Sequence, residues 1–182
     1  MSENNSPWKT LSGELIYEND WIRLDEYQVI NPSGGNGIYG KVSFKNKAIG
    51  IIPMDDDLNT WLVGQYRYTL NAYSWEIPMG GVPMNEDSEE GALRELKEET
   101  GLIAKKLDLI SKIHTSNSVT DEVGTIYLAT ELTEGEAEFD ETEVIVIKKM
   151  PFKQALDWVL EGKITDSLSI AGILKYARTL GL

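Results

Sequence analysis

Cysteine is missing from this chain of 182 residues, and histidine occurs once, at position 114. Without cysteine the chain can form no disulfide, thiolate nucleophile or zinc–sulfur site, a composition that suits a cytoplasmic protein. No apolar run approaches the roughly 20 residues of a membrane-spanning helix. Met1–Thr10 also lacks the apolar core of a secretory signal. The sequence therefore predicts a cytoplasmic protein without a membrane partner.

Basic residues are scarce: 17 lysines and arginines stand against 30 aspartates and glutamates, which gives a formal net charge of −13. A field of this sign repels nucleic acid and anionic membranes, so neither is an expected partner. It would also repel a phosphorylated substrate unless cations were bound at the site. Most of these carboxylates need no role beyond solubility, so their clustering is the informative feature.

The length of the chain fits one compact domain with a small appendage. Runs of β-branched and aromatic residues between turn residues predict strands, and capped apolar periodicity predicts helices. We place the start of the first helix at Ser88, as its N-cap, and its stop at Gly101. The expected strands are 11–17, 21–30, 38–44, 47–54, 60–68, 107–114, 124–131 and 143–149, and the expected helices are 88–100, 152–160 and 167–180.

This order of elements predicts an α+β fold, with helices packed on a mixed or antiparallel sheet. The Gly-rich loop 31–37 and the strand that follows it mark a boundary. We therefore expect an N-terminal β extension over residues 1–45 and a main domain over residues 46–182.

Three glutamates share one face of the first expected helix, because Glu95, Glu98 and Glu99 are spaced i, i+3 and i+4. A solvated acidic face is the alternative that needs no ligand. A Pro-Met-Gly-Gly turn, Pro78–Gly81, precedes the helix, and glycines let backbone carbonyls approach a cation. Carboxylate and carbonyl oxygens are the ligands that Mg²⁺ prefers, so this segment favours a magnesium site.

The segment Gly80–Leu102 resembles the Nudix box, Gly-x5-Glu-x7-Arg-Glu-aliphatic-x-Glu-Glu-x-Gly-aliphatic. It matches the pattern at every fixed position, namely Gly80, Glu86, Arg94, Glu95, Leu96, Glu98, Glu99, Gly101 and Leu102. On this resemblance the chain is identified as a member of the Nudix hydrolase family. Membership implies the Nudix fold, an α/β/α sandwich with a mixed β-sheet, and metal-dependent cleavage of a pyrophosphate.

The resemblance also implies roles for single residues. The cofactor is Mg²⁺, with Mn²⁺ as an alternative, and its expected ligands are Glu95, Glu98, Glu99 and the carbonyl of Met79. Glu98 is in addition expected to assist catalysis. Arg94 should orient the glutamates through ion pairs, and Glu86 should support the loop or reach an outer metal.

Upstream of the box, Gln65-Tyr66-Arg67-Tyr68 and Trp75–Gly81 resemble patterns of ADP-ribose and nucleoside-diphosphate-sugar pyrophosphatases. Arg67 is then expected to clamp a substrate phosphate, since a guanidinium makes bidentate contacts with phosphate. A surface ion pair is the alternative for Arg67. Glu76 is expected to bind the substrate, facing the sugar or the metal cluster.

Downstream, the acidic loop Asp140–Val144 and the helix and terminal segment after it resemble the same subgroup, in which a loop glutamate activates the attacking water. Position relative to the Glu-Gly-Lys-Ile stretch at 161–164 assigns Glu141 as the base and Glu143 as its helper. Asp140 is a third candidate. A general base must lie within hydrogen-bond distance of the attacking water, and the spacing of residues in the sequence does not determine that distance. An acidic loop without a catalytic role is the alternative.

One run departs from the subgroup. Its ADP-ribose pyrophosphatases carry a proline where this chain has Asn117, within Ser116–Glu122, and this difference favours a broader use of nucleotide sugars. His114 is interpreted as structural. The subgroup's N-terminal strands contribute to a homodimer and to base binding, which makes Trp21 and Lys45 candidates for contact with the base. For Trp21, a place in the core or the dimer interface is the favoured alternative.

We therefore predict a homodimer that hydrolyses nucleoside diphosphate sugars, of the ADP-ribose or GDP-mannose type, to a nucleoside monophosphate and a sugar phosphate. One alternative is a Nudix hydrolase of dinucleoside polyphosphates or nucleoside triphosphates. A second is a non-catalytic nucleotide-sugar sensor, which the complete set of box glutamates disfavours. A third is an acidic interaction module, which predicts no Mg²⁺ binding.

Overall fold

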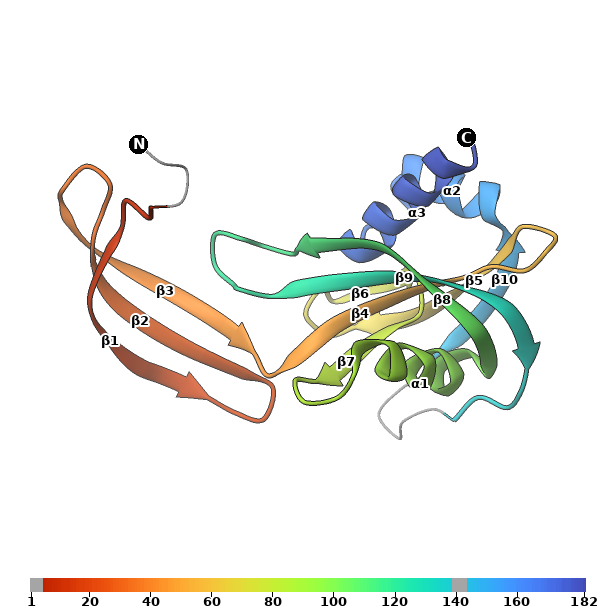
Figure 1. Cartoon of the computed structure of the whole chain (residues 1–182), viewed down its shortest axis with the longest axis horizontal. Helices are drawn as coiled ribbons and strands as arrows, with labels where there is room; N and C mark the ends of the chain where they lie inside the picture. Colours follow the sequence, from red (N-terminus) through yellow and green to blue (C-terminus); the bar gives the residue numbers. More distant parts are fainter. Residues whose placement is uncertain (1–4, 139–143) are drawn as a thin grey trace. The chain divides into compact units, whose positions relative to one another are not determined.

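The computed structural model describes residues 5–138 and 144–182 (Figure 1). The chain divides into two compact units. The first consists of Met1–Asn46 with Ser116–Glu122, and the second consists of Lys47–Thr115 with Val123–Leu182. Among the described residues, no helix is both long and apolar enough to cross a membrane.

The first unit is an antiparallel sheet of three strands in the order β1-β2-β3. The strands are β1 (Lys9–Glu18), β2 (Ile22–Ile30) and β3 (Asn36–Phe44). The segment Ser116–Glu122 joins β3, where the Val42 N–H donates to the carbonyl of Val119 at 2.9 Å. Every residue of β1 is exposed, so this strand contributes no buried residue to a core.

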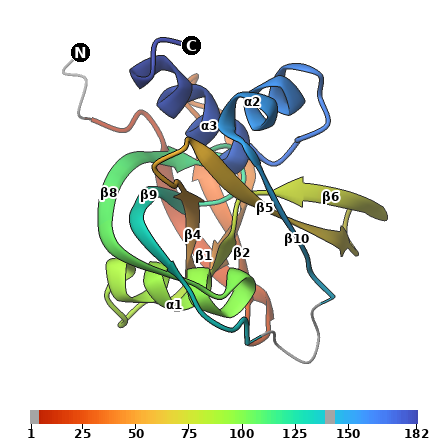
Figure 2. The ribbon, with the colours of Figure 1, turned by 90° about the vertical axis from the view of Figure 1, so that its right-hand side faces the viewer.

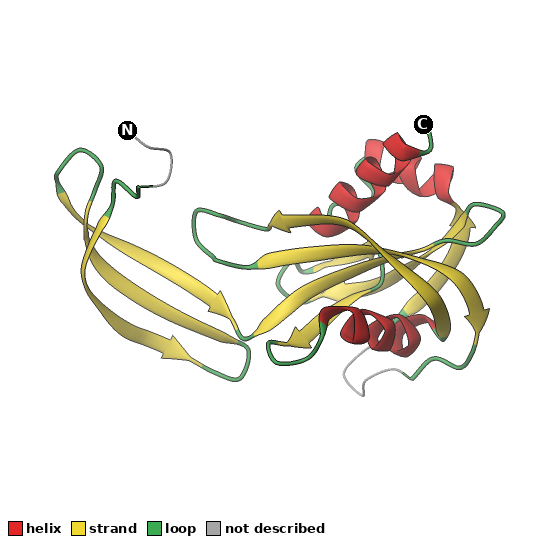
Figure 3. Cartoon of the chain, in the orientation of Figure 1, coloured by secondary structure: helices red, strands yellow, loops and turns green. Residues whose placement is uncertain are grey.

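The second unit contains two further sheets (Figure 3). One has the order β7-β4-β9-β8 and the other the order β10-β5-β6. Strands β4 and β9 run parallel and the other described pairs antiparallel, so the arrangement is mixed. The strands are β4 (Asn46–Pro53), β5 (Asn59–Arg67), β6 (Ala72–Glu76), β7 (Met79–Pro83), β8 (Leu102–His114), β9 (Val123–Glu134) and β10 (Val146–Pro151).

Helices cover these sheets from two sides (Figures 1 and 2). Helix α1 (Ser88–Thr100) lies on one side, and α2 (Phe152–Leu160) and α3 (Ser167–Thr179) lie on the other. Successive side chains of a strand point to opposite faces, and so Ile51 and Ile52 of β4 belong to different buried clusters. This layering confirms the predicted α+β fold with helices on both faces of a mixed sheet.

Candidate active site

The glutamates of the box lie on α1, whose two ends are fixed by capping. The carboxylate of Asp87 accepts hydrogen bonds from the N–H groups of Glu89 and Glu90, at 2.8 and 3.2 Å. Asp87 is therefore the N-cap, and the prediction of Ser88 was wrong by one residue. Gly101 ends the helix with φ of 73°, in the left-handed region that glycine adopts without strain.

Arg94 connects three of the box carboxylates. Its guanidinium donates to Glu95 and to Glu98 at 2.9 Å each, and to both oxygens of Glu86 at 3.3 Å. The hydrogen bonds with Glu86, outweighing partial burial and reinforced by the charges of Glu95 and Glu98, raise the pKa of Arg94 above its ordinary value. The side chain is therefore charged at every pH at which the protein works, and it relieves the repulsion between the glutamates.

Glu95 and Glu99 reach the same short stretch of backbone, Met79–Gly80 at the start of β7. Glu99 is 2% exposed, and its carboxylate accepts the Met79 N–H at 2.9 Å. The carboxylate of Glu95 lies against Gly80, where a Cβ atom would stand 2.0 Å from Oε2. Only glycine leaves room for this approach, so Gly80 is required by the position of the Glu95 side chain.

These groups fit a hard divalent cation. The Met79 carbonyl lies in the chain between the Met79 N–H, which donates to Glu99, and Gly80, whose missing Cβ leaves the space that the Glu95 carboxylate occupies. Two carboxylates and a carbonyl therefore belong to one short segment. No three acidic or histidine side chains converge as a closed metal site within the described residues. The described residues therefore supply two carboxylates and one backbone carbonyl toward such an ion.

Arg67 forms a bidentate ion pair with Glu76 across the β5–β6 hairpin. Its Nε donates to Glu76 at 3.0 Å, and its Nη2 donates to the second carboxylate oxygen. The bonds to Glu76 raise the pKa of Arg67 against the opposing effect of burial, and the charges of Glu99 and Asp166 add to the increase. Arg67 thus lies within electrostatic range of a predicted metal ligand, while the carboxylate of Glu76 is 4% exposed.

A buried hydroxyl, which sequence reasoning missed, holds the segment between Glu76 and Met79. Ser169 of α3 accepts the N–H of Ile77 at 3.0 Å and donates to Asp166 at 2.8 Å. Ser169 is fully buried. Its partner Ile77 lies 92 positions away along the chain, so no local signal in the sequence indicates this contact.

Trp21 and Lys45 both lie in the first unit. The indole of Trp21 is 68% exposed, and its carbonyl accepts the Lys45 N–H at 2.9 Å. The ammonium of Lys45 pairs with Glu18 at 3.0 Å. Trp21 is therefore no part of this unit's core.

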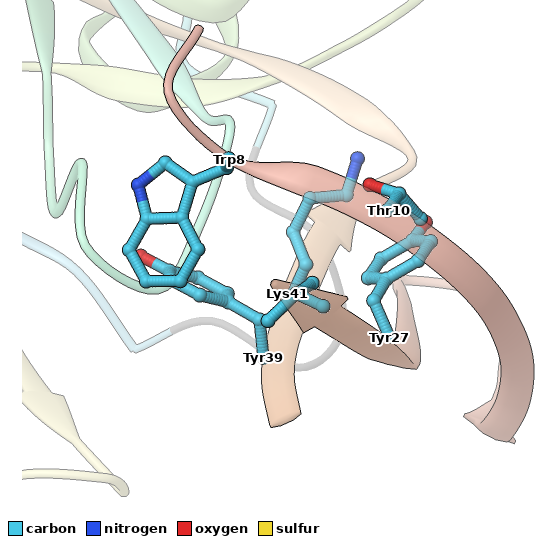
Figure 4. Close-up of a pocket in the computed structure, with 6 residues that line it drawn as sticks. Trp8, Thr10, Tyr27, Tyr39 and Lys41 are labelled. Atoms are coloured by element: carbon cyan, nitrogen blue, oxygen red, sulfur yellow. The ribbon is translucent and has the colours of Figure 1, made fainter. Parts of the chain in front are cut away.

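The first unit also has a pocket of about 240 Å³ that the sequence analysis did not predict (Figure 4). Trp8 meets Tyr39 edge-on, with ring centroids 5.4 Å apart. Lys41 lines the same pocket and pairs with Asp121 at 2.8 Å. Alternation along β3 places Tyr39 and Lys41 on one face, which is the only sequence signal for this grouping.

The remaining predicted positions fall outside this cluster. Asn117 belongs to the segment that joins the first unit, and His114, exposed at the end of β8, pairs with Val123 in the β8–β9 ladder. The three candidates for the base, Asp140, Glu141 and Glu143, lie outside the described residues.

Comparison with known proteins gives two family matches. Residues 45–168 match the family described as NUDIX domain. Residues 8–42 match the family described as nucleoside diphosphate sugar hydrolase N-terminal domain.

Relatives and a solved structure cover nearly the whole chain. An ADP-ribose pyrophosphatase of Mycobacterium tuberculosis is 34% identical over 96% of this chain and 84% of its own length. An ADP-ribose pyrophosphatase of Bacillus subtilis is 33% identical over 87% of this chain and 86% of its own length. A crystal structure of an ADP compounds hydrolase superposes with a TM-score of 0.86 at 21% identity, covering 99% of this chain and 97% of the other. The last match establishes the fold.

Proposed function

The chain belongs to the Nudix hydrolase family, and from this premise we propose that it hydrolyses the pyrophosphate of nucleoside diphosphate sugars, of the ADP-ribose and GDP-mannose type, with Mg²⁺ as its cofactor. The products are a nucleoside monophosphate and a sugar phosphate. The observation that carries the proposal is the meeting of Glu95 and Glu99 at Met79–Gly80. The family match of residues 8–42 supports a nucleotide sugar over other pyrophosphates.

We assign Glu95, Glu99 and the Met79 carbonyl as metal ligands, with Glu98 as an assisting carboxylate. A bound divalent cation supplies Lewis-acid stabilisation of the charge that develops on the pyrophosphate oxygens. Arg94 keeps Glu95 and Glu98 in place through its ion pairs. Phosphoryl transfer depends chiefly on positioning and electrostatics. The ion pairs of Arg94 position the carboxylates of Glu95 and Glu98 in the free protein, and these carboxylates supply the negative charge that a cation needs.

Arg67 has a second role in this proposal. Its Nε and Nη2 donate hydrogen bonds to Glu76, and this pair of bonds fixes the orientation of the guanidinium plane. The third nitrogen, Nη1, is the group we assign to a substrate phosphate. In this proposal Glu76 contributes to phosphate binding indirectly, by orienting Arg67.

We assign Glu141 as the base that takes a proton from the attacking water. Glu141→Gln is expected to lower kcat by about tenfold or more, because the amide accepts no proton and because Asp140 and Glu143 can replace the carboxylate only in part. The dependence of the rate on Mg²⁺ concentration should stay as in the wild type. Steady-state kinetics of Glu141→Gln beside Glu143→Gln measure this, and a larger loss for Glu143→Gln would reassign the base to Glu143.

We further propose that the first unit forms a homodimer and contributes Trp21 and Lys45 to the nucleobase. Large apolar side chains are exposed on β1 and β3, including Leu11 at 60%, Leu15 at 49% and Ile38 at 64%. Large apolar side chains exposed on one sheet are suited to a protein interface. Sedimentation should give twice the chain mass of 20.4 kDa, and a monomer at micromolar concentration would disprove the dimer.

A substrate panel tests the proposed function. ADP-ribose, GDP-mannose, UDP-glucose, a diadenosine polyphosphate and ATP are compared by kcat/KM with Mg²⁺. At least one nucleotide sugar should exceed the last two substrates by about tenfold, which corresponds to about 1.4 kcal/mol of transition-state stabilisation. Preference for the diadenosine compound or ATP would support the alternative hydrolase. Thermal stabilisation by nucleotide sugars without turnover would support the sensor.

A further inference from the structure

A pocket of about 590 Å³ lies beside the Arg67–Glu76 pair in the second unit. Its volume falls within the roughly 300–1,000 Å³ of small-molecule sites. The wall on one side is the β5–β6 hairpin, and the other wall is the turn that leads into α3. Both walls belong to the same compact unit.

Hydroxyl groups dominate the lining, with side chains contributed by Thr69, Ser74, Thr165 and Ser167. Ser74 is the most informative of them, because it is only 6% exposed. Its hydroxyl takes part in no hydrogen bond to any described residue, although it lines the pocket. Among the described residues, the Ser74 Oγ does not belong to the buried polar atoms that lack a partner, so it is open to solvent, and a ligand hydroxyl can take the place of water there. The pocket therefore presents a polar group that is ready for a ligand.

The charges around the pocket disfavour an anion. Its lining contains one guanidinium, Arg67, and two carboxylates, Glu76 and Asp166. The Nε and Nη2 of Arg67 are paired with Glu76, which leaves only Nη1 for the phosphate assigned to it above. Asp166 caps α3 by accepting the Ser169 N–H at 2.7 Å, which offsets the positive end of that helix. The lining thus has an excess of one negative charge, which suits a neutral ligand that can donate hydrogen bonds.

A polyhydroxylated ring meets these requirements. Its hydroxyls can donate to Glu76 and to Asp166, whose Oδ1 accepts no hydrogen bond from the described residues while Oδ2 accepts two. They can also exchange hydrogen bonds with Ser74 and the other lining hydroxyls. Leu70, 61% exposed at the edge of the pocket, offers an apolar surface to the C–H face of such a ring.

The pocket borders the groups that we assign to the reaction. Arg67 lines it and lies within electrostatic range of Glu99. Glu76 lines it as well and stands three positions before Met79 along the chain. A ligand held here can therefore extend toward the Met79–Gly80 segment.

We propose that this pocket binds the sugar of the nucleoside diphosphate sugar, and that Ser74 is a specificity-determining residue. The inference rests on the proposed function. The sugar hydroxyls bond to Ser74, Asp166 and Glu76, and this binding favours substrates in which the second phosphate is esterified to a sugar.

The test distinguishes the contribution of the sugar to kcat/KM from that of the pyrophosphate. Ser74→Ala removes the hydroxyl, and Ser74→Leu fills the pocket. Each is assayed with ADP-ribose and with the β-methyl ester of ADP, which has the same diester pyrophosphate without a sugar. We expect kcat/KM for ADP-ribose to fall about fivefold in Ser74→Ala and more than about tenfold in Ser74→Leu, with less than about a twofold change for the methyl ester.

Thr60→Val is the matched control, since Thr60 is 1% exposed, its hydroxyl has no partner among the described residues, and it is not among the residues lining the pocket. This variant should treat both substrates as the wild type does. Equal losses on both substrates in Ser74→Leu, or no loss on either, would overturn the sugar pocket.

Failure of the proposed function itself has a different signature, because the wild-type protein would then hydrolyse no nucleotide sugar. In that case saturation-transfer NMR with methyl β-ribofuranoside and methyl α-mannoside tests the pocket directly. Transfer to either glycoside in the wild type that is lost in Ser74→Leu supports the sugar pocket. No transfer to either glycoside overturns it.

Discussion

Glu99→Gln is expected to lower kcat for nucleotide-sugar hydrolysis by about 10²–10³-fold while the protein stays folded. Glutamine has nearly the same size, and its amide oxygen can still accept the Met79 N–H that Glu99 now accepts at 2.9 Å. What it lacks is the negative charge at a site that is 2% exposed, where the charge is needed to hold a hard divalent cation. The substitution therefore separates a metal ligand from a packing residue.

The measurement is kcat as a function of Mg²⁺ concentration, with circular dichroism and thermal unfolding to confirm the fold. Glu90→Gln is the matched control, because Glu90 is an exposed glutamate of the same helix. It should keep the activity of the wild type. Full activity in Glu99→Gln at low Mg²⁺ would show that this carboxylate holds no metal.

Gly80→Ala is expected to lower kcat/KM by about a hundredfold, although it adds only one methyl group. A Cβ at this position would lie 2.0 Å from Oε2 and 2.1 Å from Cδ of Glu95. Such distances are impossible, so the carboxylate of Glu95 has to move. A displacement of about 1 Å at a catalytic group can cost about 10²-fold in rate.

Steady-state kinetics with ADP-ribose and a thermal melt distinguish misplacement from unfolding. Gly40→Ala serves as the control, because nothing lies within 4 Å of the Cβ that it would add. We expect that variant to resemble the wild type in both measurements. Unchanged kcat/KM in Gly80→Ala would mean that the position of Glu95 has no importance for catalysis.

Elements with strong local signals could be predicted from the sequence. Helices α1 and α2 have the predicted bounds, because apolar periodicity and end signals determine both of them. The N-cap of α1 was misassigned because Asp87 and Ser88 are adjacent residues of the types that cap helices. Only the geometry shows that the Asp87 carboxylate reaches the two N–H groups.

Strands β6 and β7 were missed for a physical reason. Each has five residues, and β7 contains Gly80, Gly81 and Pro83, which read as a turn. Its place is determined by distant partners, since the Ile51 N–H donates to Pro78 at 2.8 Å beside the start of this strand. Tertiary pairing here overrides local propensity.

The candidate site, like the fold, could be predicted from the sequence only where local geometry determines it. The spacing of Glu95, Glu98 and Glu99 on one helix follows from helical geometry, and so it could be predicted. The Arg67–Glu76 pair depends on the β5–β6 hairpin register, in which Arg67 lies opposite Ala72. That register, like the contact between Ser169 and Ile77, arises only when the sheet and α3 are assembled.

The most direct test of the central claim is ³¹P NMR of ADP-ribose incubated with the full chain, first with a chelator and then with Mg²⁺ in excess. No reaction is expected with the chelator. After Mg²⁺ is added, the pyrophosphate signals should be replaced by the two monoester signals of AMP and ribose 5-phosphate. Turnover in the chelator, or products other than these two phosphate monoesters, would contradict metal-dependent pyrophosphate hydrolysis at Glu95, Glu99 and Met79.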